Sequence, residues 1–448
     1  MAVLRWAVMN AQPVWSSGDD VPRPLLVRTV AIDTLPTGAD GLLDLVPHEA
    51  PLAWVRRGDG LVGWGEALRI TTAGVDRFAD AERAWHEVLA HSVVRDEVGL
   101  PGTGPVAFGS FAFDASSDAG GVLVVPRVVV GRRGDRAWLT TIESGATLSP
   151  GPTLDSVAHH REPVTAPGKV TYTDGAVSAA GWTEVVARGV SAIRAGTVDK
   201  VVLARDVVAT AAEPVDVRWV LGRLAVDYPS CWTFSVDGML GATPELLVRS
   251  EKGLVTSRVL AGTIRRTGDD DADLGRAAIL AHSSKDLEEH EYAVTSVADA
   301  LAPFCSSTNV PDVPFVLTLP NVLHLASDVT GVLAAGRPGE PAPSSLSLAA
   351  ALHPTAAVCG TPTAAARELI LQIEGMERAR YAGPVGWFGA DGDGEWGIAL
   401  RSAEVDPTDP HTLRLFAGCG IVAASDPAAE LAESEAKLVP MRHALASD

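Results

Sequence analysis

The chain has 448 residues, and a hydrophobic share of 47% beside a charged share of 21% is typical of a globular protein with a large buried core. Its net charge of −20 excludes nucleic acid as a partner, because phosphate contacts need a basic face and no block of Lys and Arg is present. No apolar run approaches the roughly 20 residues of a membrane helix, and the first residues lack a signal-peptide pattern, so we expect no membrane partner.

The four cysteines are far apart in the sequence and form no CxxC pair. This spacing argues against both a disulfide framework and a zinc knuckle. We therefore expect reduced thiols and a cytoplasmic protein. The cysteines are Cys231, Cys305, Cys359 and Cys419.

The N-terminal part is predicted to be rich in β-structure. Residues 51–70 and 122–142 each predict a hairpin, because glycine-containing turns stand between flanks rich in β-formers. One amphipathic helix is expected near 76–91. Residues 148–178 are rich in Ser, Pro, Gly and Thr, which predicts a linker or long surface loop. We therefore divide the chain into a β-rich scaffold, 1–178, and a second part, 179–448, packed as one intimate domain.

The second part alternates between helices and strands, with a further loop at 336–345. Adjacent antiparallel strands with helices grouped outside predict a single large two-layered α+β domain, not a doubly wound parallel sheet. The predicted helices are 182–195, 214–227, 272–281, 284–302, 361–375 and a last helix that carries residues 430–437. The predicted strands are 198–209, a pair within 231–265, strands at 315–335, a hairpin at 384–405 and 412–417.

The run from Ala417 to Lys437 combines a glycine-rich turn with a helix that carries two carboxylates. Glu430, Glu433 and Lys437 are at i, i+3 and i+7, so they share one helical face. Clustered carboxylates suit a hard cation such as Mg²⁺. The same spacing equally suits an exposed helix on which Glu433 and Lys437 form a surface salt bridge. Both interpretations stay open on this segment alone.

Other charges stand where apolar patterning is expected. Lys200 opens a strand and Glu245 precedes another, so burial could make the first a general base and the second a general acid. A strand-end charge that reaches solvent is the plainer explanation for each. Asp286 and Glu289 form a second carboxylate pair at i, i+3, which also matches ordinary acidic enrichment in a first helical turn.

Seven segments spread over residues 180–440 resemble, in the same order, the chorismate-utilising enzymes and more specifically isochorismate synthases. The resemblance implies the antiparallel chorismate-binding fold of aminodeoxychorismate synthase. The segments are Val198-Asp-Lys-Val-Val-Leu-Ala-Arg205, Gly241-Ala-Thr-Pro-Glu-Leu-Leu247, Leu260-Ala-Gly-Thr263, Ser284-Lys-Asp-Leu-Glu-Glu-His290, Leu352-His-Pro-Thr355 with Cys359-Gly-Thr-Pro362, Tyr381-Ala-Gly-Pro-Val-Gly-Trp387 and residues 417–437.

The resemblance implies a Mg²⁺-dependent conversion of chorismate to isochorismate, in which water attacks C2 and the C4 hydroxyl leaves. It places the metal on Glu289 and Glu433, with Asp286 and Glu430 nearby. Lys200 corresponds to the base that activates water, and Glu245 to the acid that protonates the departing hydroxyl. Burial would shift the pKa of both groups in the required direction.

The resemblance also implies a set of substrate contacts. Arg401 and Lys437, with backbone amides of the glycine-rich turn, are expected at the carboxylate of the enolpyruvyl group. His324 corresponds to a position that lines the pocket, although a satisfied core histidine fits its sequence context nearly as well. The expected contacts are Ala261, Gly262, Thr263, His324, Thr361, Tyr381, Arg401, Gly418, Gly420, Ile421 and Lys437.

Two positions distinguish between the enzymes of this family by the nucleophile that they use. Ala261 stands where aminodeoxychorismate synthases carry a nucleophilic lysine, and Lys200 stands where the ammonia-using anthranilate synthases usually carry glutamine. We therefore expect water as nucleophile, no glutamine amidotransferase subunit and a monomer. Salicylate synthase, which continues by eliminating pyruvate, is the alternative, and a chorismate-binding module without turnover is a second. Whether the product serves a siderophore or menaquinone pathway does not follow from the sequence.

Overall fold

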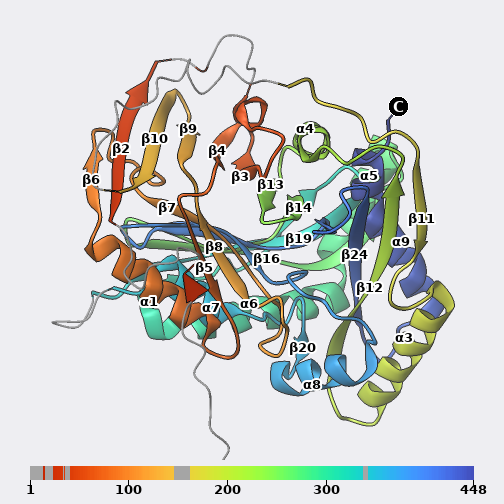
Figure 1. The fold of residues 1–448 in the computed structure, drawn as a ribbon. Coiled ribbons are helices and arrows are strands. Elements are labelled where there is room, and N and C mark those ends of the chain that lie inside the picture. Colours follow the sequence, from red (N-terminus) through yellow and green to blue (C-terminus); the bar gives the residue numbers. More distant parts are fainter. Residues whose placement is uncertain are drawn as a thin grey trace, which may run out of the picture.

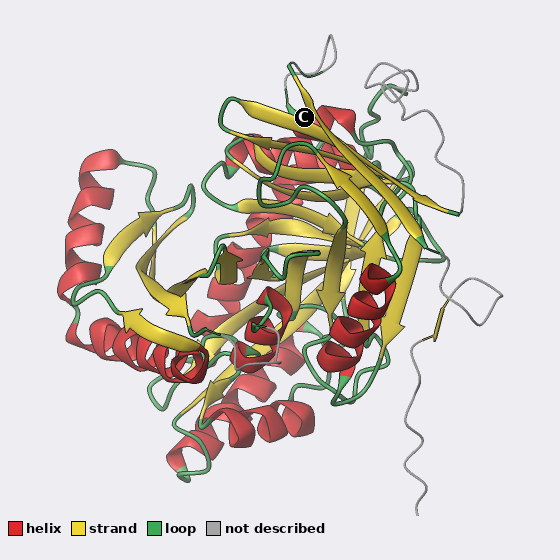
Figure 2. Cartoon of the chain, turned by 90° about the vertical axis from the view of Figure 1, so that its left-hand side faces the viewer, coloured by secondary structure: helices red, strands yellow, loops and turns green. Residues whose placement is uncertain are grey.

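The computed structural model describes residues 14–15, 24–33, 35, 41–145, 162–335 and 342–447, and for Val14, Trp15, Lys285 and Glu289 it describes the backbone only. Within these ranges the chain forms two large, mainly antiparallel β-sheets with helices on the outside (Figure 1). Figure 2 shows the strands gathered in the middle of the molecule. The predicted α+β fold with flanking helices is therefore confirmed.

The first sheet has 11 strands and draws on both halves of the sequence. In spatial order it contains β1 (Val14–Trp15), β5 (Leu68–Thr72), β8 (Gly121–Val125), β7 (Val106–Phe111), β21 (Pro384–Gly389), β22 (Gly394–Ile398), β15 (Leu246–Glu251), β16 (Leu254–Arg265), β19 (Val322–Leu333) and β17 (Cys305–Asn309), with β18 (Phe315–Thr318) also paired to β19.

The second sheet has 13 strands and likewise mixes the two halves. In spatial order it contains β11 (Val170–Asp174), β12 (Lys200–Ala211), β24 (Thr412–Ile421), β23 (Ser402–Val405), β14 (Met239–Thr243), β13 (Trp232–Val236), β3 (Leu52–Arg56), β4 (Asp59–Trp64), β9 (Val128–Arg133), β10 (Arg136–Ser144), β2 (Leu25–Ile32) and β6 (Val93–Asp96), with β20 (Gly360–Thr361) paired to β12.

The helices cover both sheets from outside. Against the first sheet pack α1 (Arg77–Ala90), α5 (Asp270–His282), α6 (Ser284–Leu301) and α7 (Ser345–Leu352). Against the second pack α3 (Ala179–Arg194), α4 (Val217–Asp227), α8 (Thr363–Ile373) and α9 (Pro427–Ala444), and Figure 1 shows α3 and α9 beside β12 and β24. None of the described helices is both long and apolar enough to span a bilayer.

The two sheets pack face to face around large aromatic side chains. Trp54 of β3, Phe234 of β13, Phe388 of β21 and Trp396 of β22 are almost completely buried in one core cluster. Gly397 lets the sheets approach closely, since a Cβ there would lie 2.8 Å from the ring of Trp54. This contact locks strands from opposite ends of the sequence together.

Most predicted elements are confirmed, and the differences have identifiable causes. The predicted strand pair at 231–265 is four strands, β13 to β16, because Asp237-Gly238 and Lys252-Gly253 close two tight hairpins. The loop predicted at 148–178 is wrong for residues 170–174, where alternating β-branched and aromatic residues form β11. The part of that loop before residue 162 lies outside the described residues, as do residues 336–341 of the second predicted loop.

Candidate active site

Two chain crossings between the sheets define the candidate site. The chain leaves the second sheet after β14 and enters the first at β15, with Glu245 between them. It returns after β22 and re-enters the second sheet at β23, with Arg401 between them. Two backbone hydrogen bonds tie the crossings together, from Ile398 N to Glu245 O at 3.2 Å and from Ala242 N to Arg401 O at 3.2 Å. Residues 156 positions apart are thereby held at one seam.

A cavity of about 110 Å³ lies at this seam. Its walls contain eight of the residues predicted from sequence, contributed by β16, β19, β24, α9, the two crossings and the segment before β21. The eight are Glu245, Thr263, His324, Tyr381, Arg401, Gly418, Gly420 and Lys437.

Glu245 is the buried carboxyl group of this cavity. Its side chain is 6% exposed, and no described residue forms a hydrogen bond with its carboxyl group. Burial raises its pKa from 4.5 to about 8, and the charges of Lys200 and Arg401 reduce that rise without cancelling it. Glu245 is therefore protonated at neutral pH and able to give up a proton.

Lys200 lies beside the cavity, on the same face of β12 as the wall residues Val202 and Ala204. A Cβ at Gly420 would lie 3.0 Å from Lys200 Cε and 3.5 Å from Nζ, so the glycine leaves room for the lysine side chain to lie over β24. Lys200 also lines a second cavity of about 400 Å³, together with Thr361 and Glu288. The lysine therefore lies next to a wall residue of the first cavity and is itself a wall of the second.

Arg401 supplies a positive charge that forms no salt bridge with a described residue, although Glu433 acts on it electrostatically. Among the described residues no side chain or carbonyl group is hydrogen-bonded to its guanidinium group. Its backbone has φ of 50°, a left-handed conformation that costs a non-glycine residue roughly 1–2 kcal/mol. A strained residue that brings an unpaired guanidinium into a cavity is suited to bind a carboxylate.

Lys437 of α9 reaches the cavity across the end of β24. Its Nζ donates to Gly418 O at 2.8 Å and pairs with Glu433 at 2.7 Å. The lysine side chain is only 14% exposed, so this is no solvated surface pair. With Arg401 it makes the cavity positive within a chain of net charge −20.

Two contacts fix the remaining polar walls. Thr263 Oγ1 is 2.9 Å from Nδ1 of His324, whose pKa is lowered to about 3 by burial and by the charges of Arg401 and Lys437. The imidazole is therefore neutral. Tyr381 stacks on Phe416 with ring centroids 4.9 Å apart, and its hydroxyl approaches Gly418, where a Cβ would lie 3.2 Å away.

The carboxylates of α9 form the candidate metal centre. Oxygens of Glu430 and Glu433 and the sulfur of Cys419 all lie within 4.8 Å of one another. Burial raises the pKa of the Cys419 thiol to about 12, so it is a neutral thiol, and the two carboxylates are the donors. Oxygen donors from two carboxylates match Mg²⁺, which is bound through one or two such groups plus substrate.

The other predicted metal ligands are on α6. Asp286 accepts a hydrogen bond from the hydroxyl group of Ser283 and lies across from Gly262, where a Cβ would be 3.1 Å from Asp286 Cβ. Among the described residues it does not join the α9 cluster. The side chain of Glu289 lies outside the described part of the chain.

Four predicted contacts are not among the walls of this cavity. Ala261 is buried opposite Leu325, Ile421 is completely buried opposite Val201, and Gly262 has φ of 78° at an irregularity between β16 and β19. Ala261 and Ile421 could therefore meet a ligand only through their backbone. Thr361, paired to Lys200 across β20 and β12, lines the second cavity.

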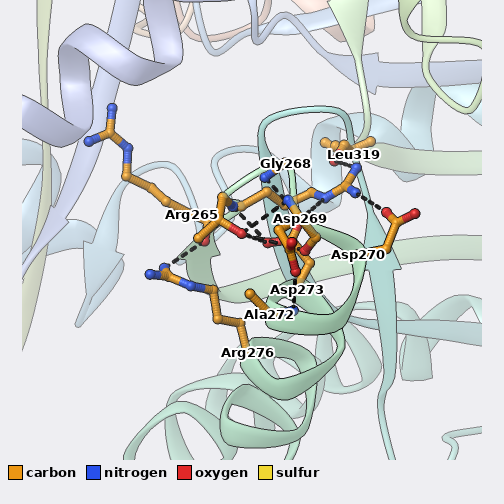
Figure 3. Close-up of polar contacts among 10 residues, drawn as sticks. Arg265, Gly268, Asp269, Asp270, Ala272, Asp273, Arg276 and Leu319 are labelled. Atoms are coloured by element: carbon orange, nitrogen blue, oxygen red, sulfur yellow. Dashed lines mark hydrogen bonds and ion pairs between the residues drawn. The ribbon is translucent and has the colours of Figure 1, made fainter.

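The end of β16 is held by a polar turn (Figure 3). Asp273 accepts hydrogen bonds from Arg266 Nε at 2.8 Å, Thr267 N at 2.6 Å and Gly268 N at 3.3 Å. Arg276 donates to Arg265 O at 2.9 Å. This network connects β16, which carries Thr263, to the start of α5.

Sequence reasoning missed several walls of the cavity. Arg378 is the most polar of them and forms a buried ion pair with Glu374. The signal was present as a Glu and an Arg at i, i+4, but that spacing is also common on exposed helices. The other missed walls are apolar and include Val202, Leu260, Ala357, Val358 and Phe416.

These features define a class of protein: a two-sheet α+β fold with a small positive cavity, a protonated buried carboxyl group and a carboxylate pair at its edge. The model of the family described as "Chorismate binding enzyme" matches residues 53–446. The chain belongs to this family, and the resemblance found in the sequence is confirmed.

Named relatives agree with this membership. The chain is 42% identical over 274 residues to isochorismate synthase DhbC of Bacillus subtilis, covering 59% of this chain and 67% of that protein. It is 35% identical over 460 residues to the salicylate biosynthesis isochorismate synthase of Pseudomonas aeruginosa, covering 95% and 91%. The solved structure of MenF, the menaquinone-specific isochorismate synthase of Escherichia coli, superposes with a TM-score of 0.76 at 25% identity, covering 96% and 97%.

Proposed function

We propose that the protein is an isochorismate synthase, which converts chorismate to isochorismate by adding water at C2 with loss of the C4 hydroxyl group. The observation that carries the proposal is the protonated, buried Glu245 in a cavity that also holds Arg401 and Lys437, with Lys200 close enough to act on it electrostatically. Relatives named as isochorismate synthases, matched over most of the chain, support it.

The chain's own residues suit each part of the reaction. Lys200 would take a proton from the attacking water, which can reach it from the second cavity. Glu245 would donate its proton to the departing hydroxyl group, since burial keeps that proton in place at neutral pH. Arg401 and Lys437 would bind a substrate carboxylate, and neutral His324 with Thr263 would complete a polar wall.

The choice of water rests on Ala261, which stands where aminodeoxychorismate synthases carry a nucleophilic lysine. The alanine side chain has no nucleophilic atom and is buried against β19. A lysine base is needed for water but not for ammonia, which is already nucleophilic. We therefore propose that the protein works without a glutamine amidotransferase subunit, and as a monomer because one chain supplies the whole cavity.

We also propose Mg²⁺ as the cofactor. Glu430 and Glu433 would hold it from α9, and Asp286 and Glu289 of α6 are the further candidates. When bound, Mg²⁺ supplies positive charge that offsets the ring carboxylate and draws electrons from the conjugated system.

Product analysis tests the proposal. Incubating the protein with chorismate and Mg²⁺ and separating the products by chromatography should give isochorismate alone. Salicylate together with pyruvate would instead identify a salicylate synthase. A protein that binds chorismate but consumes none would be a binding module.

The metal assignment predicts that Glu433→Gln raises the Mg²⁺ concentration needed for half-maximal activity by at least about 10-fold. Losses of metal affinity of this size are typical when a metal site loses a supporting group. Calorimetric titration of Mg²⁺ should show the same weakening. Glu435→Gln is the matched control, because Glu435 lies on the same helix but pairs with Arg205 and Arg442. Equal Mg²⁺ titrations for the two variants would remove Glu433 from the site.

A further inference from the structure

Strand β12, which begins at Lys200, is flanked along one edge by two short strands with a gap between them. Along the edge that faces away from β24, residues 200–201 pair with β20 and residues 207–211 pair with β11. Within the described residues, no strand pairs with residues 202–206 on that edge. The buried backbone groups of this gap need other partners.

A buried ion pair fills much of the gap. Arg378 Nη2 donates to Val202 O at 2.8 Å, and Glu374 Oε2 accepts from Ala204 N at 2.8 Å. The two side chains are joined twice, from Nε to Oε1 at 2.7 Å and from Nη2 to Oε2 at 2.6 Å. With side chains 1% and 4% exposed, the pair provides two of the partners that a neighbouring strand would provide. Cys359 O, which accepts from Val202 N at 2.8 Å, and Trp182 Nε1, which donates to Ala204 O at 2.9 Å, provide two more.

The same arginine reaches two other segments of the site. Its Nη1 donates to Val358 O at 3.0 Å, in the segment that leads to Thr361, and Tyr381 N donates to Arg378 O at 2.9 Å. The guanidinium carbon lies 4.3 Å from the ring centroid of Phe113, which comes from the N-terminal half. One residue therefore touches the strand of Lys200, the segment before Thr361 and the start of the Tyr381 segment.

The chemistry of the pair favours a geometric role. Burying two charges is costly, and apolar residues of similar size would often give equal stability, so stability is a weak reason for the pair. The guanidinium fork has fixed directions, however, and binds a carboxylate and carbonyl oxygens at set angles. Four of its N–H groups are already committed by the bonds above, which leaves little capacity for a ligand.

We propose that Glu374 and Arg378 form a positioning pair that holds β12 and residues 353–361 in the register that aims Lys200 and Thr361 at the substrate. The catalytic side of this inference rests on the proposed function. Its structural side, the hold on β12, can be measured without turnover.

The first measurement is steady-state kinetics of Glu374→Gln and Arg378→Lys. We expect kcat to fall on the order of 10-fold to 100-fold, as for a misplaced catalytic group, while KM for chorismate changes little. Asp216→Asn is the matched control: Asp216 and Arg218 form an ion pair of 2.6 Å with side chains 0% and 7% exposed, at the start of α4 and away from the cavity walls. The control should keep its kcat.

The second measurement is amide hydrogen exchange of the peptide that covers residues 200–206, at a temperature where circular dichroism shows every variant folded. Exchange should be faster in Glu374→Gln and Arg378→Lys, and unchanged in Asp216→Asn. If Arg378→Lys does not fold, Glu374→Gln carries the test because glutamine keeps the shape of glutamate.

The outcomes separate the inference from the proposed function. Faster exchange with a lower kcat supports the positioning pair. Unchanged exchange, faster exchange with unchanged kcat, or a raised KM alone overturns it. A wild-type protein that converts no chorismate overturns the proposed function, while faster exchange in the variants would still support the hold on β12.

Discussion

Replacing Lys200 with alanine is expected to lower kcat for isochorismate formation on the order of 10²-fold to 10⁴-fold, the range that a positioned general base contributes. The reason is its position: the side chain lies over Gly420, lines the second cavity and acts electrostatically on Glu245. Water attack without a base would leave the developing proton with no acceptor. Steady-state rates at saturating chorismate and Mg²⁺ measure the effect.

Binding distinguishes this role from a structural one. Calorimetry should show chorismate and Mg²⁺ binding to Lys200→Ala within a few-fold of the wild type, since Arg401, Lys437 and the α9 carboxylates remain. Lys252→Ala is the control, because Lys252 is an exposed lysine in the turn between β15 and β16. Turnover of Lys200→Ala at the wild-type rate would remove Lys200 from the role of base.

Much of the site could be predicted because its residues stand in short, local patterns. Lys200 at a strand start, Glu245 after a proline and the glycine-rich end of β24 each break an apolar pattern with a polar residue. Such breaks are visible in sequence, and the structure gathers most of them around one cavity. The antiparallel fold followed from hairpin turns in the same local way.

The way in which distant segments come together at the site could not be predicted from such local patterns. Nothing local in the sequence says that the chain changes sheets at Glu245 and again at Arg401, because both flanks of each residue are ordinary strands. The Glu374 and Arg378 pair was overlooked for a similar reason. Its i, i+4 spacing is the same for a solvated pair and for a buried one, and only tertiary packing decides between them.

On the last helix, the ion pair that the sequence allows does form, but not on an exposed surface. Glu433 and Lys437 do form the i, i+4 ion pair that the sequence allows. The lysine is nevertheless largely buried and bonded to Gly418, and the carboxylate of Glu433 lies beside that of Glu430. This salt bridge therefore places both charges at the edge of the cavity. The proposed roles use both of them, the lysine for a substrate carboxylate and the glutamate for Mg²⁺.

Glu245→Gln is the second change with a large expected effect, on the order of 10²-fold to 10⁴-fold in kcat/KM, because glutamine has the same shape but no proton to donate. In the wild type, the pKa of about 8 predicts that kcat/KM falls as pH rises through 8, where the buried carboxyl group loses its proton. Measuring kcat/KM between pH 6 and 9 should show this limb in the wild type and lose it in the variant.

The raised pKa of Glu245 also predicts that the folded protein loses stability as pH rises. Its pKa in the folded state, about 8, lies above the ordinary value of 4.5, so its contribution to stability is complete below pH 4.5 and is lost as pH rises through 8. The loss should amount to a few kcal/mol of unfolding free energy. Glu245→Gln, which is permanently neutral, should escape this loss and so gain stability relative to the wild type at pH 8.

Asp393→Asn is the control that separates the pH dependence of stability from the pH dependence of kcat/KM. Asp393 lies before β22, outside the cavity walls, and burial raises its pKa from 3.8 to about 6. Its contribution to stability should therefore be lost at lower pH, as pH rises through 6, while the pH profile of kcat/KM stays that of the wild type. Denaturant unfolding at pH 5, 7 and 8.5 measures both variants. If Glu245→Gln retained the alkaline limb of the wild-type activity profile, the proton donor would have to be another group.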